Sequence, residues 1–392
     1  MGKNGLMSVM NSAKYFSRDA LRSLPEVLVE WRRARPRTGV VFLLPEVEQA
    51  RVAAIQAAGR EADVPVIGAI FPALLGSEGF LTEGAWALCY DPMPPWFLID
   101  RPDASQPLSA RELCASVHSL ITEQPAGDSA PTLFLVFDGM VPNVSTILLG
   151  LFEEFGRRVR YGGVNAGSET FQPMPCLFDG RRIVGNGVLG LMLPASTHVL
   201  ARHAYPVSKS LMRATTTTGN RIDQIDGRPA FDVYRQLIQS EYGITVTQDN
   251  FYNYAVHFPF GVVTALDVLV RIPVALTDDG ALFCVGEVPP SSILRLLRAP
   301  SIEESNCIDV IAKSMGSGGG IANGAPLLAF YCAGRRMHFG VEDANKEVVG
   351  LMHRVSPAGL AGALSLGEID TDEEMGMPRF QNAAMVCLTD RE

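Results

Sequence analysis

A strand–helix–strand unit occurs twice in the first half of this chain, and it restricts the fold more than any other sequence feature. In the first copy, the apolar segment 39–45 precedes residues 46–60, whose apolar side chains recur at helical spacing, and the apolar segment 64–69 follows. The second copy consists of segments 132–138, 143–155 and 159–163. Short apolar strands that alternate with amphipathic helices are typical of sheets covered by helices. The sequence therefore predicts an α/β fold with internal repeats.

Additional strands are predicted around these units. Glycine-containing loops and short apolar segments occur at residues 80–90, 174–178 and 187–193, and again at 359–369 and 382–388. Glycine turns between such segments are typical of mixed sheets. Before the first unit, apolar side chains recur at roughly helical spacing over residues 8–36, which predicts an N-terminal helix.

The pattern of apolar strands and amphipathic helices is interrupted between Pro194 and Pro206, where we place a domain boundary. A different order of strands and helices is predicted after it. A helix with Pro229 near its first turn and Gly243 as its C-cap is predicted there. The other predicted elements are strands 211–218 and 221–225, the hairpin of 268–274 and 281–286, and the helix 303–313. We therefore predict an N-terminal helical segment at 1–37 and two domains, 38–200 and 201–390, built from mixed sheets with flanking helices.

The composition limits the partners of such a protein. With 47% hydrophobic and 19% charged residues, the chain is globular. Its net charge of −9, without a basic segment, argues against nucleic acid or an anionic membrane as a partner. Its apolar segments are too short to span a membrane. Seven widely spaced cysteines, and no export signal near the N-terminus, predict a cytoplasmic protein with reduced thiols.

Two segments predict contacts with a ligand. Residues 162–168 come at the end of a predicted strand and are rich in glycine. Because glycine has no side chain, the backbone here could approach a ligand closely, and its N–H groups could bind a carboxylate or phosphate. The alternative is a tight structural turn. Arg271 lies in an apolar segment, where a buried guanidinium needs a partner such as a ligand carboxylate; the alternative is an exposed strand face. Glu368 and Arg335 are predicted to line the same cleft or to pair with each other.

Catalytic and metal-binding patterns are weak in this sequence. Its six histidines never occur at metal-ligand spacing, which argues against a structural metal. No nucleophilic serine motif is present. Cys332, close to Arg335, is the candidate nucleophile of a cysteine-dependent hydrolase, but a buried apolar role for this thiol is the preferred interpretation. His203 and His257 are the candidate axial ligands if the protein binds haem. We therefore expect a protein that is not an enzyme.

Several motifs, in this order and spacing, resemble the FIST proteins, in which a FIST N domain precedes a FIST C domain. They are segments 136–139, 161–167, 215–220, 222–230, 269–271, 328–335 and 362–369, with Asn382 after them. The resemblance implies a sensory module of intracellular signal transduction that binds a small ligand, such as an amino acid or another small carboxylate, and reports to a signalling partner. It also implies an alternative, a haem protein that senses nitric oxide and acts with a histidine kinase.

The predicted ligand-binding site combines the residue patterns with this resemblance. It consists of Asp138, Gly163, Asn165, Ala166, Gly167, Ser168, Arg271, Arg335, Glu368 and Asn382. We expect no resident cofactor, with haem on His203 or His257 as the alternative. Because these residues come from both predicted domains, we expect a cleft to which both contribute.

Overall fold

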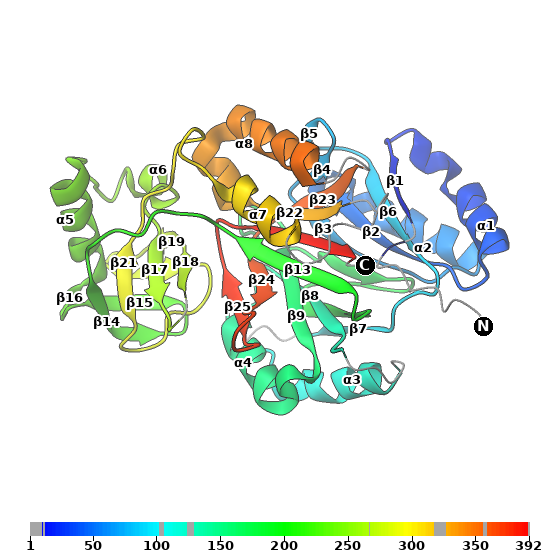
Figure 1. Ribbon diagram of the computed structural model, residues 1–392, viewed down its shortest axis with the longest axis horizontal. Helices are drawn as coiled ribbons and strands as arrows, with labels where there is room; N and C mark the ends of the chain where they lie inside the picture. Colours follow the sequence, from blue (N-terminus) through cyan, green and yellow to red (C-terminus); the bar gives the residue numbers. More distant parts are fainter. Residues whose placement is uncertain are drawn as a thin grey trace.

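Three modules of one design form the body of the protein. The computed structural model describes residues 10, 12–101, 106–123, 129–265, 267–316, 327–355 and 359–390. Within them, three six-stranded sheets form the body and an eight-stranded sheet forms a separate unit, which Figure 1 shows on the left. Each module has a strand, a helix, a parallel strand, a hairpin and an antiparallel return strand. The internal repeat predicted from the first half of the chain therefore has a third copy near its C-terminal end.

The elements of the modules follow one order. Module one contains β2 (Gly39–Pro45), α2 (Val52–Glu61), β3 (Val66–Phe71), β4 (Leu74–Gly76), β5 (Gly79–Leu81) and β6 (Ala85–Tyr90). Module two contains β8 (Thr132–Asp138), α4 (Val144–Phe155), β9 (Arg160–Ala166), β10 (Leu177–Asp179), β11 (Ile183–Val184) and β12 (Gly187–Leu193). Module three contains β22 (Leu327–Cys332), α8 (Ala333–Val355), β23 (Leu360–Ser365), β24 (Glu368–Thr371), β25 (Pro378–Gln381) and β26 (Met385–Asp390).

The modules exchange strands, so that each sheet contains strands of two modules. The hairpin β4–β5 pairs with β23 of module three, β10 pairs with β3 of module one, and β24 pairs with β9 of module two. The connecting strands β7 (Trp96–Asp100) and β13 (Thr197–Arg202) pair with β12 and β26. The first strand, β1 (Ser12–Phe16), pairs with β6. The three sheets are therefore interlocked.

Apolar side chains fill the space between the three sheets and cover their outer faces. Val41, Val136 and Leu328, one from each sheet, belong to a single central core. Figure 1 shows that pairs of helices pack outside: α1 (Leu24–Ala34) with α2, α3 (Ala110–Thr122) with α4, and α7 (Cys307–Gly316) with α8. No helix in the described part of the chain is long and apolar enough to cross a membrane.

An inserted unit with its own apolar core lies between modules two and three. Its strands are β14 (Met212–Thr218), β15 (Arg221–Ile225), β16 (Arg228–Pro229), β17 (Phe260–Val263), β18 (Val268–Arg271), β19 (Pro273–Leu276), β20 (Leu282–Cys284) and β21 (Ile293–Leu296), and its helices are α5 (Ala230–Tyr242) and α6 (Phe251–Ala255). The predicted C-cap is confirmed, since Gly243 ends α5 in the left-handed conformation at φ 70°. The unit contacts the body where β18 lies against β25.

The prediction of one N-terminal helix is wrong for its first half. In the described part of residues 8–36, β1 precedes a short 3-10 helix, and α1 begins only at Leu24. Tyr15 pairs with Trp86 across the two strands, and their rings lie 5.5 Å apart. This long-range pairing with β6 satisfies the backbone of β1 and outweighs its local apolar spacing.

Candidate functional site

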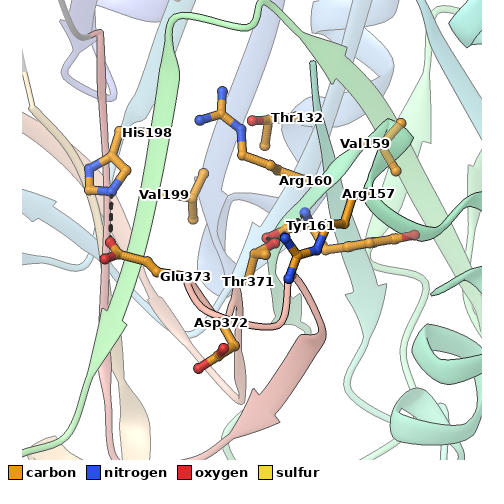
Figure 2. Close-up of a pocket in the computed structure, with 11 residues that line it drawn as sticks. Thr132, Arg157, Val159, Arg160, Tyr161, His198, Val199, Thr371, Asp372 and Glu373 are labelled. Carbon is orange, nitrogen blue, oxygen red and sulfur yellow. Dashed lines mark hydrogen bonds and ion pairs between the residues drawn. The ribbon is translucent and has the colours of Figure 1, made fainter. Parts of the chain in front are cut away.

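Two cavities lie on opposite sides of the turn between β24 and β25, residues 372–377. One, which we call the Arg271 cavity, has a volume of about 370 Å³ and lies between α4, the inserted unit and this turn. The other, the Arg160 cavity, has a volume of about 400 Å³ and lies between β9, β13 and the turn (Figure 2). Asp372 lines both cavities. The turn is thus a wall that the two cavities share.

The Arg271 cavity is mainly apolar. Its apolar lining includes Leu148, Leu149, Val262, Leu269, Met375, Met377 and Phe380. Ser145, Thr264, Arg271, Glu287, Asp372 and Arg379 are its polar lining residues. Concave apolar sites with a few convergent polar groups are typical of small-molecule binding sites, and 370 Å³ is within the usual range of volumes.

Arg271 brings a buried positive charge into this cavity. Its side chain comes from the end of β18 and is only 3% exposed. Its Nε donates to the Glu287 carbonyl at 2.9 Å, Nη1 to the Phe380 and Val270 carbonyls at 2.7 and 3.1 Å, and Nη2 to Ser145 Oγ at 3.3 Å. None of the hydrogen bonds that Arg271 makes to described residues goes to a carboxylate. Burial without a bonded anion lowers the pKa of Arg271 to about 10.

Glu287 places a negative charge in the same cavity. Its carboxylate accepts hydrogen bonds from the Thr146 backbone N–H at 3.0 Å and from the Thr146 hydroxyl at 2.5 Å. Thr146 lies in the first turn of α4, whose unpaired N–H groups favour an anion. The cavity therefore presents a cation and an anion at the edge of an apolar interior.

Arg379, the second arginine of the cavity, is neutralised by acidic residues. Its Nε and Nη2 bind Asp370 at 2.9 and 2.6 Å, and its Nη1 binds Asp267 at 3.1 Å. These ion pairs connect β25 to β24 and to the start of β18. Arg379 therefore stabilises the turn and the docking of the inserted unit, and Arg271 is the arginine suited to an external anion.

The strand predicted at 159–163 extends further, so the prediction of a loop is wrong for residues 164–166. Strand β9 ends only at Ala166. A Cβ atom at Gly163 would lie 2.0 Å from the Leu135 carbonyl oxygen of β8, which explains the glycine by close approach of two strands. Asn165 and Ala166 lie beside Gly163 in β9 and are buried. None of the three lines the Arg271 cavity.

Other predicted site residues hold loops and interfaces together. Asp138 accepts hydrogen bonds from the Met140 and Asn186 N–H groups, and burial raises its pKa. The Gly167 N–H donates to the Ile70 carbonyl, and Ser168 bonds to Thr170. The Asn382 amide oxygen accepts from the Ile272 N–H at 3.3 Å, which connects the body to the inserted unit.

Arg335 is held by groups of the protein itself; of the two alternatives predicted for it, it neither pairs with Glu368 nor lines the Arg271 cavity. Its Nε and Nη2 bind the Glu347 carboxylate at 2.8 and 2.6 Å. Nη1 donates to the His203 and Ala383 carbonyls, and Nη2 also donates to Ser305 Oγ. All five N–H donors of a guanidinium are therefore used within the fold.

Glu368 is buried without a bonded cation among the described residues. Its carboxyl group accepts hydrogen bonds from the Ser365 hydroxyl at 2.6 Å and from the Ala384 N–H at 3.3 Å. Burial raises the pKa of Glu368 to about 8, although the Ser365 bond acts in the opposite direction. This residue is fully enclosed and lines neither cavity.

Cys332 is expected to resist alkylation in the folded protein. It is 2% exposed, its Sγ accepts a hydrogen bond from the Ala383 N–H at 3.1 Å, and burial raises its pKa. Cys114 is the one partly exposed cysteine of the seven. Iodoacetamide at neutral pH should therefore modify Cys114 first, and mass spectrometry of peptides identifies the site. Unfolding in denaturant should expose all seven thiols, whereas rapid native labelling of Cys332 would contradict the expectation.

The two histidines considered for haem contact other parts of the protein. His203 accepts from the Tyr205 N–H at Nδ1, 2.9 Å away, and its Nε2 lies 3.0 Å from the Val268 carbonyl. His257 Nδ1 lies 2.6 Å from His338 Nδ1. His203 thus uses both ring nitrogens in the fold. No group of three or more described side chains could hold a metal ion.

Sequence reasoning missed Glu287 and the turn at residues 372–377. Glu287 follows Val285 and Gly286 and precedes Val288, so it is an isolated charge in a mainly apolar segment, as Arg271 is. The same criterion would have found it. The turn has no such pattern, because its role follows from the position of β24 beside β9.

Comparison with protein families agrees with the residues that suggested a relationship. The FIST N domain matches residues 37–228, and the FIST C domain matches residues 230–370. No curated protein matches the chain. The two matches follow one another over most of the sequence, and the chain therefore belongs to the FIST family.

Proposed function

We propose that this protein is a sensor that binds a small amphipathic carboxylate, in particular an amino acid with an apolar side chain, in the Arg271 cavity. FIST domains are associated with sensing in signal transduction. The observation that carries the proposal is a buried arginine whose charge is balanced by no directly bonded carboxylate of the described residues, in an apolar cavity that also contains Glu287.

Each part of such a ligand has a counterpart in the cavity. Because Nε and Nη1 of Arg271 donate to backbone carbonyls, a ligand carboxylate would bind Nη2, and it would share or replace the bond of Nη2 to Ser145 Oγ. An ammonium group would lie near Glu287, and an apolar side chain would contact Leu148, Leu269 or Phe380. Since the walls belong to the inserted unit, α4 and the β24–β25 turn, a bound ligand would connect these elements. This connection would report the ligand to a signalling partner.

Three related probes test which groups the cavity recognises. They are phenylalanine, 3-phenylpropionate, which lacks the amine, and phenethylamine, which lacks the carboxylate. We expect phenylalanine to raise the melting temperature of the protein most. 3-Phenylpropionate should raise it less, through its contact with Arg271, and phenethylamine should leave it unchanged. A panel of the other amino acids and small carboxylates then defines the preferred side chain. If no amino acid or carboxylate binds, the proposal fails.

Substitutions at the cavity should weaken this binding. Arg271→Lys keeps the charge but not the fork and should weaken the carboxylate contact, and Arg271→Ala should weaken it further, by about 2–5 kcal/mol. Because Arg271 also donates to backbone carbonyls, Leu149→Trp provides a second variant: Leu149 is 44% exposed at the cavity and a larger ring would fill it.

The matched control for Leu149→Trp is Leu211→Trp, at a 63% exposed leucine remote from the cavity lining. Calorimetric titration with the best probe measures affinity, and the melting temperature of each ligand-free variant measures stability. If the Arg271 variants lose stability but keep affinity, and Leu149→Trp binds like Leu211→Trp, then Arg271 is structural and the site lies elsewhere.

A further inference from the structure

The first turn of α4 contacts both charged side chains that the inserted unit brings to the Arg271 cavity. Ser145 Oγ accepts a hydrogen bond from Arg271 Nη2 at 3.3 Å. The next residue, Thr146, donates its backbone N–H and its hydroxyl to the two oxygens of the Glu287 carboxylate, at 3.0 and 2.5 Å. The cation and the anion therefore have separate partners on one turn of one helix.

These two charges lie close to each other without forming an ion pair. Arg271 Nε donates to the backbone carbonyl of Glu287 itself at 2.9 Å, and a Cβ atom at Gly286 would lie 3.2 Å from the same nitrogen. The structure describes both side chains, and no ion pair joins them. Because the backbone of Glu287 already touches the guanidinium, rotation about the side-chain bonds of Glu287 would bring its carboxylate to Arg271.

The turn that holds the two charges is itself firmly anchored. Val144, Ile147 and Leu148 of α4 are buried in the body of the protein. Asn143, the N-cap residue, donates its Nδ2 group to the Leu108 carbonyl at 2.7 Å. The N–H groups of a first helical turn lack partners in the helix and favour an anion. The start of α4 therefore offers the glutamate a fixed alternative to the arginine.

We propose that Thr146 is a positioning residue that holds Glu287 away from Arg271, so that the cavity receives a zwitterionic ligand. Ser145 complements it as an uncharged partner of Arg271, which a ligand carboxylate replaces more easily than it would replace a glutamate. Without Thr146, the two side chains would neutralise each other, since opposite charges attract more strongly in an apolar site than in water. This role depends on the function proposed above, and it implies that the site is built for a zwitterion and not for a simple carboxylate.

Thr146→Val keeps the shape of the side chain and removes the hydroxyl donor to Glu287. The carboxylate should then turn to Arg271, and 3-phenylpropionate, which has no ammonium group, should bind about fivefold more weakly. Thr146→Ser retains the hydroxyl and should restore the affinity to within twofold. Thr122→Val is the matched control, at an exposed threonine in the last turn of α3 and outside the cavity lining. Titration calorimetry measures the affinity of each variant.

Glu287→Gln separates this role from a general loss of structure. When no anion is left to pair with Arg271, the addition of Thr146→Val to Glu287→Gln should change the affinity for 3-phenylpropionate less than twofold. In Glu287→Gln, phenylalanine should lose its advantage over 3-phenylpropionate, because its ammonium group no longer meets a carboxylate. If Thr146→Val weakens binding equally with and without Glu287, then Thr146 only maintains the fold and the proposal is overturned.

A crystal structure of Thr146→Val distinguishes the failure of this proposal from the failure of the proposed function. We expect an oxygen of the Glu287 carboxylate to lie about 2.8 Å from a nitrogen of Arg271 in this variant. If the carboxylate stays at the N–H group of residue 146 while the unaltered protein binds phenylalanine, the proposed function stands and the role of Thr146 is wrong. If neither phenylalanine nor 3-phenylpropionate binds the unaltered protein, the proposed function fails, and the zwitterion site fails with it.

Discussion

Replacement of Arg335 by leucine is expected to lower the free energy of unfolding by about 3–5 kcal/mol, because it leaves the Glu347 carboxylate charged and buried without its cation. Both side chains are enclosed, at 0% and 1% exposure. The Arg335 donors also satisfy the carbonyls of His203 and Ala383, and its guanidinium stacks on Phe339 at 4.9 Å. Urea unfolding followed by circular dichroism measures the change.

A double variant separates the ion pair from simple loss of packing. In Arg335→Met with Glu347→Leu both charges are absent, so much of the lost stability should return. Arg336→Leu is the matched control, since Arg336 binds Glu169 in a more exposed ion pair, and its cost should stay near or below about 1 kcal/mol. If Arg335→Leu costs no more than Arg336→Leu, the structural role assigned to Arg335 is wrong.

Glu368→Gln is expected to remove a large pH dependence of stability. The folded-state pKa of Glu368 is raised to about 8 from its ordinary value of 4.5. Between these two values the unfolded chain has released the proton and the folded protein still holds it. The folded state then binds one proton more, so its stability falls as the pH rises, by about 1.4 kcal/mol per pH unit at most.

A glutamine at this position is neutral at every pH, so the variant should lack that slope. The difference in unfolding free energy between Glu368→Gln and the unaltered protein should therefore grow as the pH increases through the window and level off above a pH of about 8. Urea unfolding at a series of pH values measures this difference. Glu303→Gln, at an exposed glutamate, is the control, and its unfolding free energy should change with pH in parallel with that of the unaltered protein. Parallel curves for both variants would show that Glu368 is ionised in the folded state.

The strands that are buried on both faces were the easiest elements to predict. Segments 39–45, 132–138 and 187–193 are continuously buried, so each appears in the sequence as an apolar run whose ends coincide with the strand. No local sequence pattern predicts that the modules exchange hairpins. Val164 and Glu368, for example, pair directly across β9 and β24 although a long stretch of chain separates them.

The candidate site, too, could be predicted from the sequence only in part. Arg271 was predicted because a charge that interrupts an apolar segment is visible in the sequence. The pairing of Arg335 with Glu347 was not, because residues 12 apart in a straight helix lie about 18 Å apart. Gly340 breaks α8 with φ 75° and allows the two side chains to meet. No spacing rule for a regular helix could have anticipated that contact.

The exchange of hairpins has a consequence for how the chain folds while it is being synthesised. Leu75 of β4 pairs with Gly362 of β23, so its partner is made 362 − 75 = 287 residues later. At roughly 5–20 residues per second, a ribosome needs about 15–60 s to add that length. During this interval the apolar hairpin β4–β5 has no sheet to join. The nascent chain therefore depends on its own last module to complete its first.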